Sequence, residues 1–224
     1  MNKVIELKEV WKIYHVGEVE IKALRGLTLS VRKGEFLAIL GKSGSGKSTC
    51  VNHIGCLDTP TKGEIFLDGQ NIAHFGESHL ASIRGKKIGF IFQSFNLIPS
   101  MSALQNVILP MIFQGTSKEE RISRSKELLT LVGLEDRMQN RPMQLSGGQQ
   151  QRVAIARALA NNPEVILADE PTGNLDSKTE NDIMSLLSDL HKKENKTIVM
   201  ITHNEKLAKY AQRIIHLVDG RVGA

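Results

Sequence analysis

Gly41-Lys42-Ser43-Gly44-Ser45-Gly46-Lys47-Ser48 is the stretch that decides the fold of this chain. It fits the pattern G-x-x-x-x-G-K-[ST], follows an uninterrupted apolar run at 36–40, and precedes a segment expected to be helical. Such a turn binds phosphate, because glycines let backbone N–H groups approach the oxygens and the helix dipole favours an anion. Lys47 is expected to contact the outer phosphates, and the Ser48 hydroxyl to bind Mg²⁺.

The composition is that of an ordinary globular protein of 224 residues, with 41% hydrophobic and 24% charged residues. No apolar run approaches the roughly 18 residues that span a bilayer, and residues 1–6 lack the apolar core of a secretion signal. Cys50 and Cys56 are too few for a disulfide framework and are expected to be buried thiols. The net charge of +5 suits an anionic nucleotide or an acidic membrane surface, whereas 4% aromatic residues argue against a nucleic-acid partner.

Short apolar runs alternate with helical segments and predict an α/β fold with a largely parallel sheet. Four runs have the continuous apolar character of strands buried on both faces: 36–40, 88–92, 165–168 and 198–201. Less regular strands are expected at 4–7, 23–31, 64–67 and 214–218, and helices at 48–56, 149–160 and 177–192. Capping-box patterns at Ser117 and Ser177 mark helix starts. We expect one domain over 1–224, with a core at 1–93 and 142–224 and an inserted helical lobe at 94–141.

Polar residues end several of these strands, and in an open α/β sheet ligands bind beyond the carboxyl ends of the strands. Asp169 is expected to orient Mg²⁺ through its water shell, and Glu170 to take the proton of an attacking water. Gln93 can offer its amide oxygen to Mg²⁺ or water at the point where the helical lobe begins. His203 can donate a hydrogen bond to the γ-phosphate and hold the water together with Glu170.

A second glycine-rich helix start, Leu145-Ser146-Gly147-Gly148-Gln149, presents bare backbone N–H groups and a hydroxyl. Such a helix start is an anion site, but the chain already has one phosphate loop. A two-fold dimer accommodates both, with each nucleotide between the phosphate loop of one subunit and the Ser146–Gln149 loop of the other. Residues 174–176 lie between the carboxylates and the next helix and are placed to touch the partner. Asp176 equally fits a helix N-cap.

These motifs, in this order, resemble the ATP-binding subunit of ABC transporters across nearly the whole chain. The match comprises a Tyr14 loop, residues 41–49, Gln93, residues 145–149, 165–170 and 174–176, and His203. Residues 17–24, 54–58 and 92–99 are similar to the subgroup with lipoprotein-release, macrolide-export and cell-division-associated ATPases. Lys42 stands where Pro is common and adds a positive charge near the phosphates. Asn174 and Asn204 stand where Ala and Asp are common, and neither removes a catalytic group.

The resemblance implies a P-loop NTPase fold with a RecA-like core, an N-terminal antiparallel β subdomain and an inserted α-helical subdomain. It implies an ATPase that uses ATP and Mg²⁺ in a head-to-tail homodimer and powers a separate integral membrane permease, of an exporter or mechanotransmission type. The chain would then lie peripherally at the cytoplasmic face of the membrane. The implied catalytic residues are Lys47, Gln93, Glu170 and His203, and the implied Mg²⁺ ligands are Ser48, Gln93 and Asp169.

The implied nucleotide contacts fall into three groups. Within one subunit they are Tyr14, whose ring would stack on the nucleobase, and Gly41, Lys42, Ser43, Gly44, Ser45, Gly46, Lys47, Ser48 and Thr49. The contacts made in trans are Ser146, Gly147, Gly148 and Gln149. The residues at the dimer seam are Asn174, Leu175 and Asp176.

Two other classes of P-loop protein make different predictions. A chromosome-maintenance or DNA-repair ATPase shares the 145–149 motif but carries long coiled coils or DNA-binding insertions, and the span from Gln93 to Leu145 has no sustained heptads. A GTPase switch requires an N-K-x-D motif for guanine, and Asn195-Lys196-Thr197-Ile198 lacks the Asp.

Overall fold

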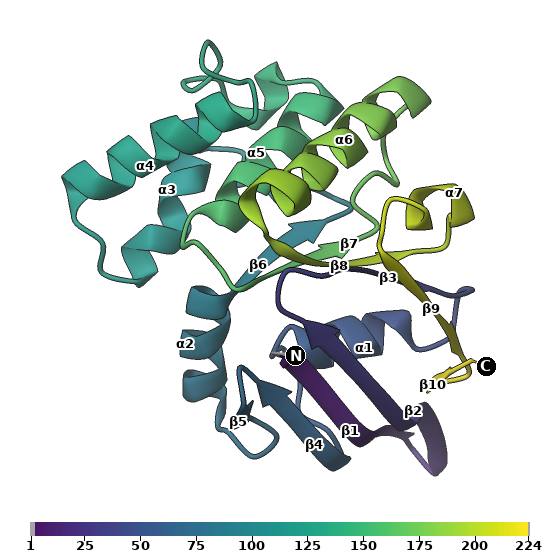
Figure 1. Cartoon of the computed structure of the whole chain (residues 1–224). Coiled ribbons are helices and arrows are strands. Elements are labelled where there is room, and N and C mark those ends of the chain that lie inside the picture. Colours follow the sequence, from purple (N-terminus) through teal and green to yellow (C-terminus); the bar gives the residue numbers. More distant parts are fainter. Residues whose placement is uncertain (1–2, 224) are drawn as a thin grey trace.

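The chain, described over residues 3–223 in a computed structural model, is built on two sheets with helices around them (Figure 1). The larger sheet has six strands in the order β10-β9-β3-β8-β7-β6. Its strands are β3 (Phe36–Leu40), β6 (Ile88–Phe92), β7 (Val165–Asp169), β8 (Thr197–Thr202), β9 (Arg213–Val218) and β10 (Arg221–Val222). All neighbours pair in parallel except β10, which runs antiparallel to β9. The predicted, mostly parallel sheet is confirmed.

The smaller sheet is antiparallel and has the strand order β2-β1-β4-β5. Its strands are β1 (Lys3–Val16), β2 (Val19–Arg32), β4 (Lys62–Leu67) and β5 (Gln70–Asn71). The long β1–β2 hairpin ends near the start of helix α1 (Lys47–Ile54), which lies between the two sheets (Figure 1). This sheet is the antiparallel subdomain that the resemblance implied.

Two apolar clusters form on opposite faces of the parallel sheet, because successive side chains of a strand point to opposite faces. In β3, Leu37 and Ile39 join the cluster that contains α1 and the antiparallel sheet. Phe36 and Ala38 join the cluster beneath the helices of the other face. Both faces of the strand are therefore buried, which explains its continuous apolar sequence.

The second face is covered by α5 (Gly147–Leu159) and α6 (Ser177–Glu194), and α3 (Ala103–Phe113) and α4 (Lys118–Leu131) pack beyond α5 (Figure 1). The remaining helical segments are α2 (Glu77–Lys87), the 3₁₀ turn η1 (Pro142–Gln144) and α7 (Glu205–Ala208). Within residues 3–223, no helix has both the length and the apolar character that crossing a membrane requires.

Several predicted boundaries are wrong. The first strand continues from Leu7 to Val16, since bulges let β1 pair on past its polar residues. The helix after the phosphate loop ends at Ile54 because Cys56 has a positive φ of 54°. The last long helix does begin at Ser177, but its N-cap is Asp176, whose carboxylate accepts from two backbone N–H groups of the first turn.

Candidate functional site

A cleft of about 1550 Å³ opens at the carboxyl edge of the parallel sheet. Four neighbouring parallel strands end there, so residues from distant parts of the sequence meet at one edge. The phosphate loop follows β3, Gln93 follows β6, Glu170 follows β7 and His203 follows β8. All of these line the cleft together with Asp169, as the strand ends predicted.

The phosphate loop turns sharply at two of its glycines. Gly44 and Gly46 have φ values of 78° and 97°, in the left-handed region that favours glycine. A Cβ on Gly46 would stand 2.6 Å from the Ala23 carbonyl oxygen. Gly46 is also the N-cap of α1 and supplies no side-chain cap, so the N–H groups of the first helical turn are left for an anion.

Two side chains of this loop fit a phosphate ligand. Lys47 Nζ donates to the carbonyls of Gly41 and Lys42 at 2.7 and 2.8 Å, which holds the ammonium group over the loop. Ser45 is buried, and its hydroxyl oxygen has no hydrogen-bond partner. A polar atom buried without a partner is costly unless a ligand satisfies it. The loop therefore has the donors and the shape of a triphosphate cradle.

Asp169 ends β7 inside the cleft, and burial raises the pKa of its carboxyl. The charge of Glu170 raises it further, whereas Lys47 opposes both effects. Two adjacent carboxylates in a half-buried site favour a bound cation, because a cation offsets their repulsion. Together with the hydroxyl of Ser48, which also lines the cleft, this oxygen-rich donor set fits Mg²⁺, which prefers oxygen ligands.

Glu170 and His203 form the most direct contact among the predicted catalytic residues. His203 Nδ1 donates to Glu170 Oε1 at 2.9 Å. Glu170 has a φ of 45°, which is strained for a residue with a side chain. Its backbone N–H donates to the Ile201 carbonyl at 2.9 Å and thereby fixes the carboxylate between β7 and β8. A carboxylate held in this way can orient a water and accept its proton.

The second glycine-rich segment lies outside this cleft, and residues 145–149 contribute nothing to its lining. Ser146 and Gln149 instead cap α5 reciprocally: Ser146 Oγ accepts from the Gln149 N–H, and Gln149 Oε1 accepts from the Ser146 N–H. Gly148 lets α5 approach α6, since a Cβ there would collide with Thr179. Gly147 packs against Leu175. The predicted contact of Ser146, Gly147, Gly148 and Gln149 with a nucleotide is thus not made within one chain.

The segment 174–176 links the cleft to α6. Asp176 Oδ1 accepts from the backbone N–H groups of Lys178 and Thr179, so it caps the helix, which is one of the two predicted alternatives. A hydrogen bond from the Thr179 hydroxyl to Asp176 Oδ2 at 2.7 Å, together with these backbone hydrogen bonds, lowers the pKa of Asp176. Asn174 is exposed and contacts Gln93.

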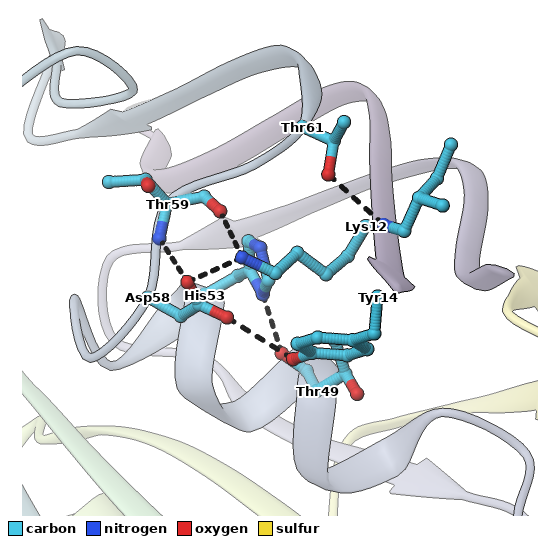
Figure 2. Close-up of polar contacts among 8 residues, drawn as sticks. Lys12, Tyr14, Thr49, His53, Asp58, Thr59 and Thr61 are labelled. Atoms are coloured by element: carbon cyan, nitrogen blue, oxygen red, sulfur yellow. Dashed lines mark hydrogen bonds and ion pairs between the residues drawn. The ribbon is translucent and has the colours of Figure 1, made fainter. Parts of the chain in front are cut away.

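Tyr14 lies at the end of β1 nearest α1, beside a group of polar side chains (Figure 2). Its hydroxyl donates to Asp58 Oδ2 at 3.2 Å. Lys12 Nζ donates to Asp58 Oδ1 at 2.6 Å and lies 5.2 Å from the centre of the Tyr14 ring. Burial and the charge of Asp58 raise the pKa of Tyr14. Tyr14 is 37% exposed but stands outside the lining of the cleft, so the predicted stacking of its ring on a nucleobase stays a prediction.

Sequence reasoning missed Lys12, Asp58 and the buried His53, which donates from Nδ1 to the Thr49 carbonyl at 2.7 Å (Figure 2). The residues come from β1 and from α1 and the turn after it, and 46 positions separate Lys12 from Asp58. No local spacing pattern joins them, so only the β1–β4 pairing brings them together.

Comparisons with known proteins agree with this geometry. The family model described as ABC transporter matches residues 24–173. An uncharacterized ABC transporter ATP-binding protein of Thermotoga maritima is 55% identical over 222 residues, which cover 99% of this chain and 94% of that protein. The macrolide export ATP-binding/permease protein MacB of Hyphomonas neptunium is 50% identical over 218 residues, 97% of this chain but 34% of the relative.

Solved structures give the same result. The ATP-binding cassette MJ0796 of Methanocaldococcus jannaschii, in a dimeric post-hydrolysis state bound to ADP and Pi, superposes with a TM-score of 0.90 at 52% identity, over 98% of this chain and 97% of that one. The predicted P-loop fold, family, ATPase activity and use of ATP with Mg²⁺ are confirmed. The chain belongs to the ABC transporter family and is one of its ATP-binding, ATP-hydrolysing subunits.

Proposed function

We propose that this subunit hydrolyses ATP at two composite sites of a head-to-tail homodimer and thereby drives a separate membrane permease. The proposal rests on one observation: the two glycine-rich segments that could bind a nucleotide lie apart within one chain. The cleft holds the phosphate loop, Asp169, Glu170 and His203, while the glycine-rich start of α5 faces elsewhere. A second copy related by a two-fold axis supplies the missing contacts to each nucleotide.

The chain's own residues account for the chemistry. The loop at 41–48 and Lys47 hold the triphosphate, and Ser48, Gln93 and Asp169 would hold Mg²⁺, which supplies charge neutralisation on the phosphate oxygens when bound. Glu170 orients a water in line with the γ-phosphorus and accepts its proton as the new P–O bond forms. ADP leaves with the bridging oxygen, and inorganic phosphate is the second product. His203 fixes the Glu170 carboxylate through the 2.9 Å contact.

Glu170→Gln tests this mechanism, because the amide keeps the shape of the side chain but cannot accept the proton. We expect ATP binding to persist, turnover to fall about 10²–10⁴-fold, and an ATP-dependent dimer to accumulate, as measured by light scattering. Glu119→Gln on the exposed start of α4 is a matched control. Turnover near the wild-type rate in Glu170→Gln would refute the assignment of the base.

The proposed permease partner would dock in a groove of about 700 Å³ between the helical lobe and the core. Apolar side chains line it, including Leu57, Phe90 and Phe113, and Phe113 is 78% exposed. The groove reaches Arg157, whose guanidinium donates to the carbonyls of Phe95 and Asn96 just beyond Gln93. Movement of a docked partner would thus reach a proposed Mg²⁺ ligand.

With a permease docked there, the subunit would lie at the cytoplasmic face of a membrane, and the likeness to MacB supports an exporter. A photoreactive residue in place of Phe113 tests it in intact cells. We expect crosslinks to an integral membrane protein. Crosslinks confined to soluble proteins would contradict the docking site.

A further inference from the structure

Gln93 and Asn174 form a reciprocal amide pair that closes the gap between two strand ends. Gln93 Nε2 donates to Asn174 Oδ1 at 3.3 Å, and Asn174 Nδ2 donates to the Gln93 backbone carbonyl at 3.0 Å. Gln93 follows β6 and Asn174 lies in the turn after β7, and these strands are neighbours in the sheet. The pair therefore joins a residue of the cleft to the segment at the proposed dimer seam.

The pair decides which end of the Gln93 side chain is available. A glutamine amide has one oxygen that accepts and one nitrogen that donates. Because the nitrogen is engaged by Asn174, the oxygen is left for a ligand, and oxygen is the atom that Mg²⁺ requires. If the Gln93 amide were rotated by half a turn, its N–H groups would face the cation, and the hydrogen bond from Gln93 Nε2 to Asn174 Oδ1 would be lost.

The backbone around Asn174 is shaped for this contact. A Cβ on Gly173 would stand 2.5 Å from Gln93 Nε2, so only glycine leaves room for the amide to lie across the turn. The turn after β7 is held together by backbone hydrogen bonds and does not depend on the Asn174 side chain. The Gly173 N–H already donates to the Glu170 carbonyl at 3.1 Å, and the Leu175 N–H donates to the Thr172 carbonyl at 3.0 Å.

We propose that Asn174 is a positioning residue that holds the Gln93 amide with its oxygen toward the nucleotide cleft, and so links the 174–176 segment to the Mg²⁺ site. The inference rests on the proposed function of Gln93. It assigns a role to a side chain that the proposed mechanism does not use. A change in the 174–176 segment on dimer closure then reaches the metal ligand directly.

A double-mutant cycle of Asn174→Ala, Gln93→Ala and the double variant tests the proposal. The first readout is the Mn²⁺ affinity of the ATP complex, measured by electron paramagnetic resonance of free Mn²⁺ in a Glu170→Gln background, where turnover does not interfere. Loss of the two hydrogen bonds of Asn174 should weaken Mn²⁺ binding about three- to tenfold. The double variant should bind Mn²⁺ no more weakly than Gln93→Ala alone, because Asn174 acts through Gln93.

The second readout is the side-chain amide resonance of Gln93 in a ¹⁵N spectrum of the nucleotide-free protein, which should shift in Asn174→Ala. Asn71→Ala is the matched control. Asn71 also makes two amide hydrogen bonds, to Glu64 Oε1 at 3.1 Å and from the Ala73 N–H at 3.0 Å, in the antiparallel sheet. It should change neither readout.

Unchanged Mn²⁺ affinity in Asn174→Ala, or an equal loss with and without Gln93, would overturn the inference. If Gln93→Ala alone leaves Mn²⁺ affinity intact, the inference fails because Gln93 is no metal ligand. The proposed function would survive that result, since it stands on the turnover of Glu170→Gln and on the dimer.

Discussion

Asp58→Asn is a small change at the centre of the polar group beside Tyr14. The Asp58 carboxylate accepts from Lys12 Nζ at 2.6 Å, from the Tyr14 hydroxyl at 3.2 Å and from the Thr59 N–H at 2.8 Å. An asparagine has one acceptor oxygen in place of two and no charge. The amide nitrogen can still donate to the Tyr14 hydroxyl, but the charge that holds Lys12 beside the ring is lost, so the orientation of the ring is fixed less firmly.

The expected loss follows from what Tyr14 is proposed to do. Stacking of a base on an aromatic ring contributes about 1–3 kcal/mol. The ring is displaced rather than removed, so we expect a loss of about 1 kcal/mol, which is about a fivefold weaker affinity for ATP. Inorganic tripolyphosphate lacks the base and contacts only the phosphate loop, so its affinity should not change.

Calorimetric titration of both ligands in a Glu170→Gln background measures the two affinities without turnover. Asp68→Asn is the matched control, because Asp68 forms a similarly short ion pair with Lys87 at 2.5 Å outside the cleft. Equal weakening of ATP and tripolyphosphate in Asp58→Asn would show that the whole loop is disturbed. Unchanged affinity for ATP would show that the Asp58–Tyr14 contact does not serve the base. Either result refutes the reasoning.

Three further predictions concern buried or half-buried ionisable groups. Burial raises the pKa of Glu35, but the hydrogen bonds that its carboxylate accepts from Arg213 and the Arg32 N–H outweigh burial, so the pKa is lowered. Ionised Glu35 therefore stabilises the fold fully at pH values above the ordinary glutamate pKa. This stabilisation is lost as pH falls through the lowered pKa of the folded state. Glu35→Gln should therefore lower the free energy of unfolding in urea by about 2 kcal/mol at pH 7, a figure that allows for the partial exposure of Arg213. This cost should shrink as pH falls below the ordinary glutamate pKa of 4.5, and a cost that is the same at every pH would contradict the reasoning. The pKa of Asp169 is raised by burial and by Glu170, so this residue favours the folded state less as pH rises. Asp169→Asn should abolish turnover yet raise the free energy of unfolding without nucleotide at pH 7, and a lower value would count against the geometry. Burial raises the pKa of Cys50 to about 12 and that of Cys56 to about 11, so both thiols should be unreactive in the folded protein. A thiol-specific chromogenic disulfide should react with the two thiols only after the protein is unfolded. Rapid reaction with the native protein would contradict the burial of the two cysteines.

The sequence predicted the parallel sheet and its catalytic edge well, because strands buried on both faces leave continuous apolar runs and polar residues mark where they end. The sequence predicted the helices and strands that bury only one face less well. Helix α2 was missed because Leu80 is its one buried residue. The length of β1 was missed because polar residues and bulges interrupt its pattern.

Contacts between residues that are far apart in the sequence could not be predicted from it either. Gln93 and Asn174 are 81 positions apart, and each was assigned a separate role from its place after a strand. Their pairing depends on the adjacency of β6 and β7, which follows from the order of strands in the sheet and not from any local pattern.

Mixing two defective copies tests the composite site most directly. Lys47→Ala removes the charge from the phosphate loop, and Ser146→Arg blocks the α5 start that should contact the partner's nucleotide. Thermal melting first shows that each variant is folded. Each variant alone should then be inactive. In an equal mixture half of the dimers keep one intact site, so turnover should recover to about a quarter of the wild-type rate per chain. A mixture as inactive as either copy alone would contradict an ATP site shared between two subunits.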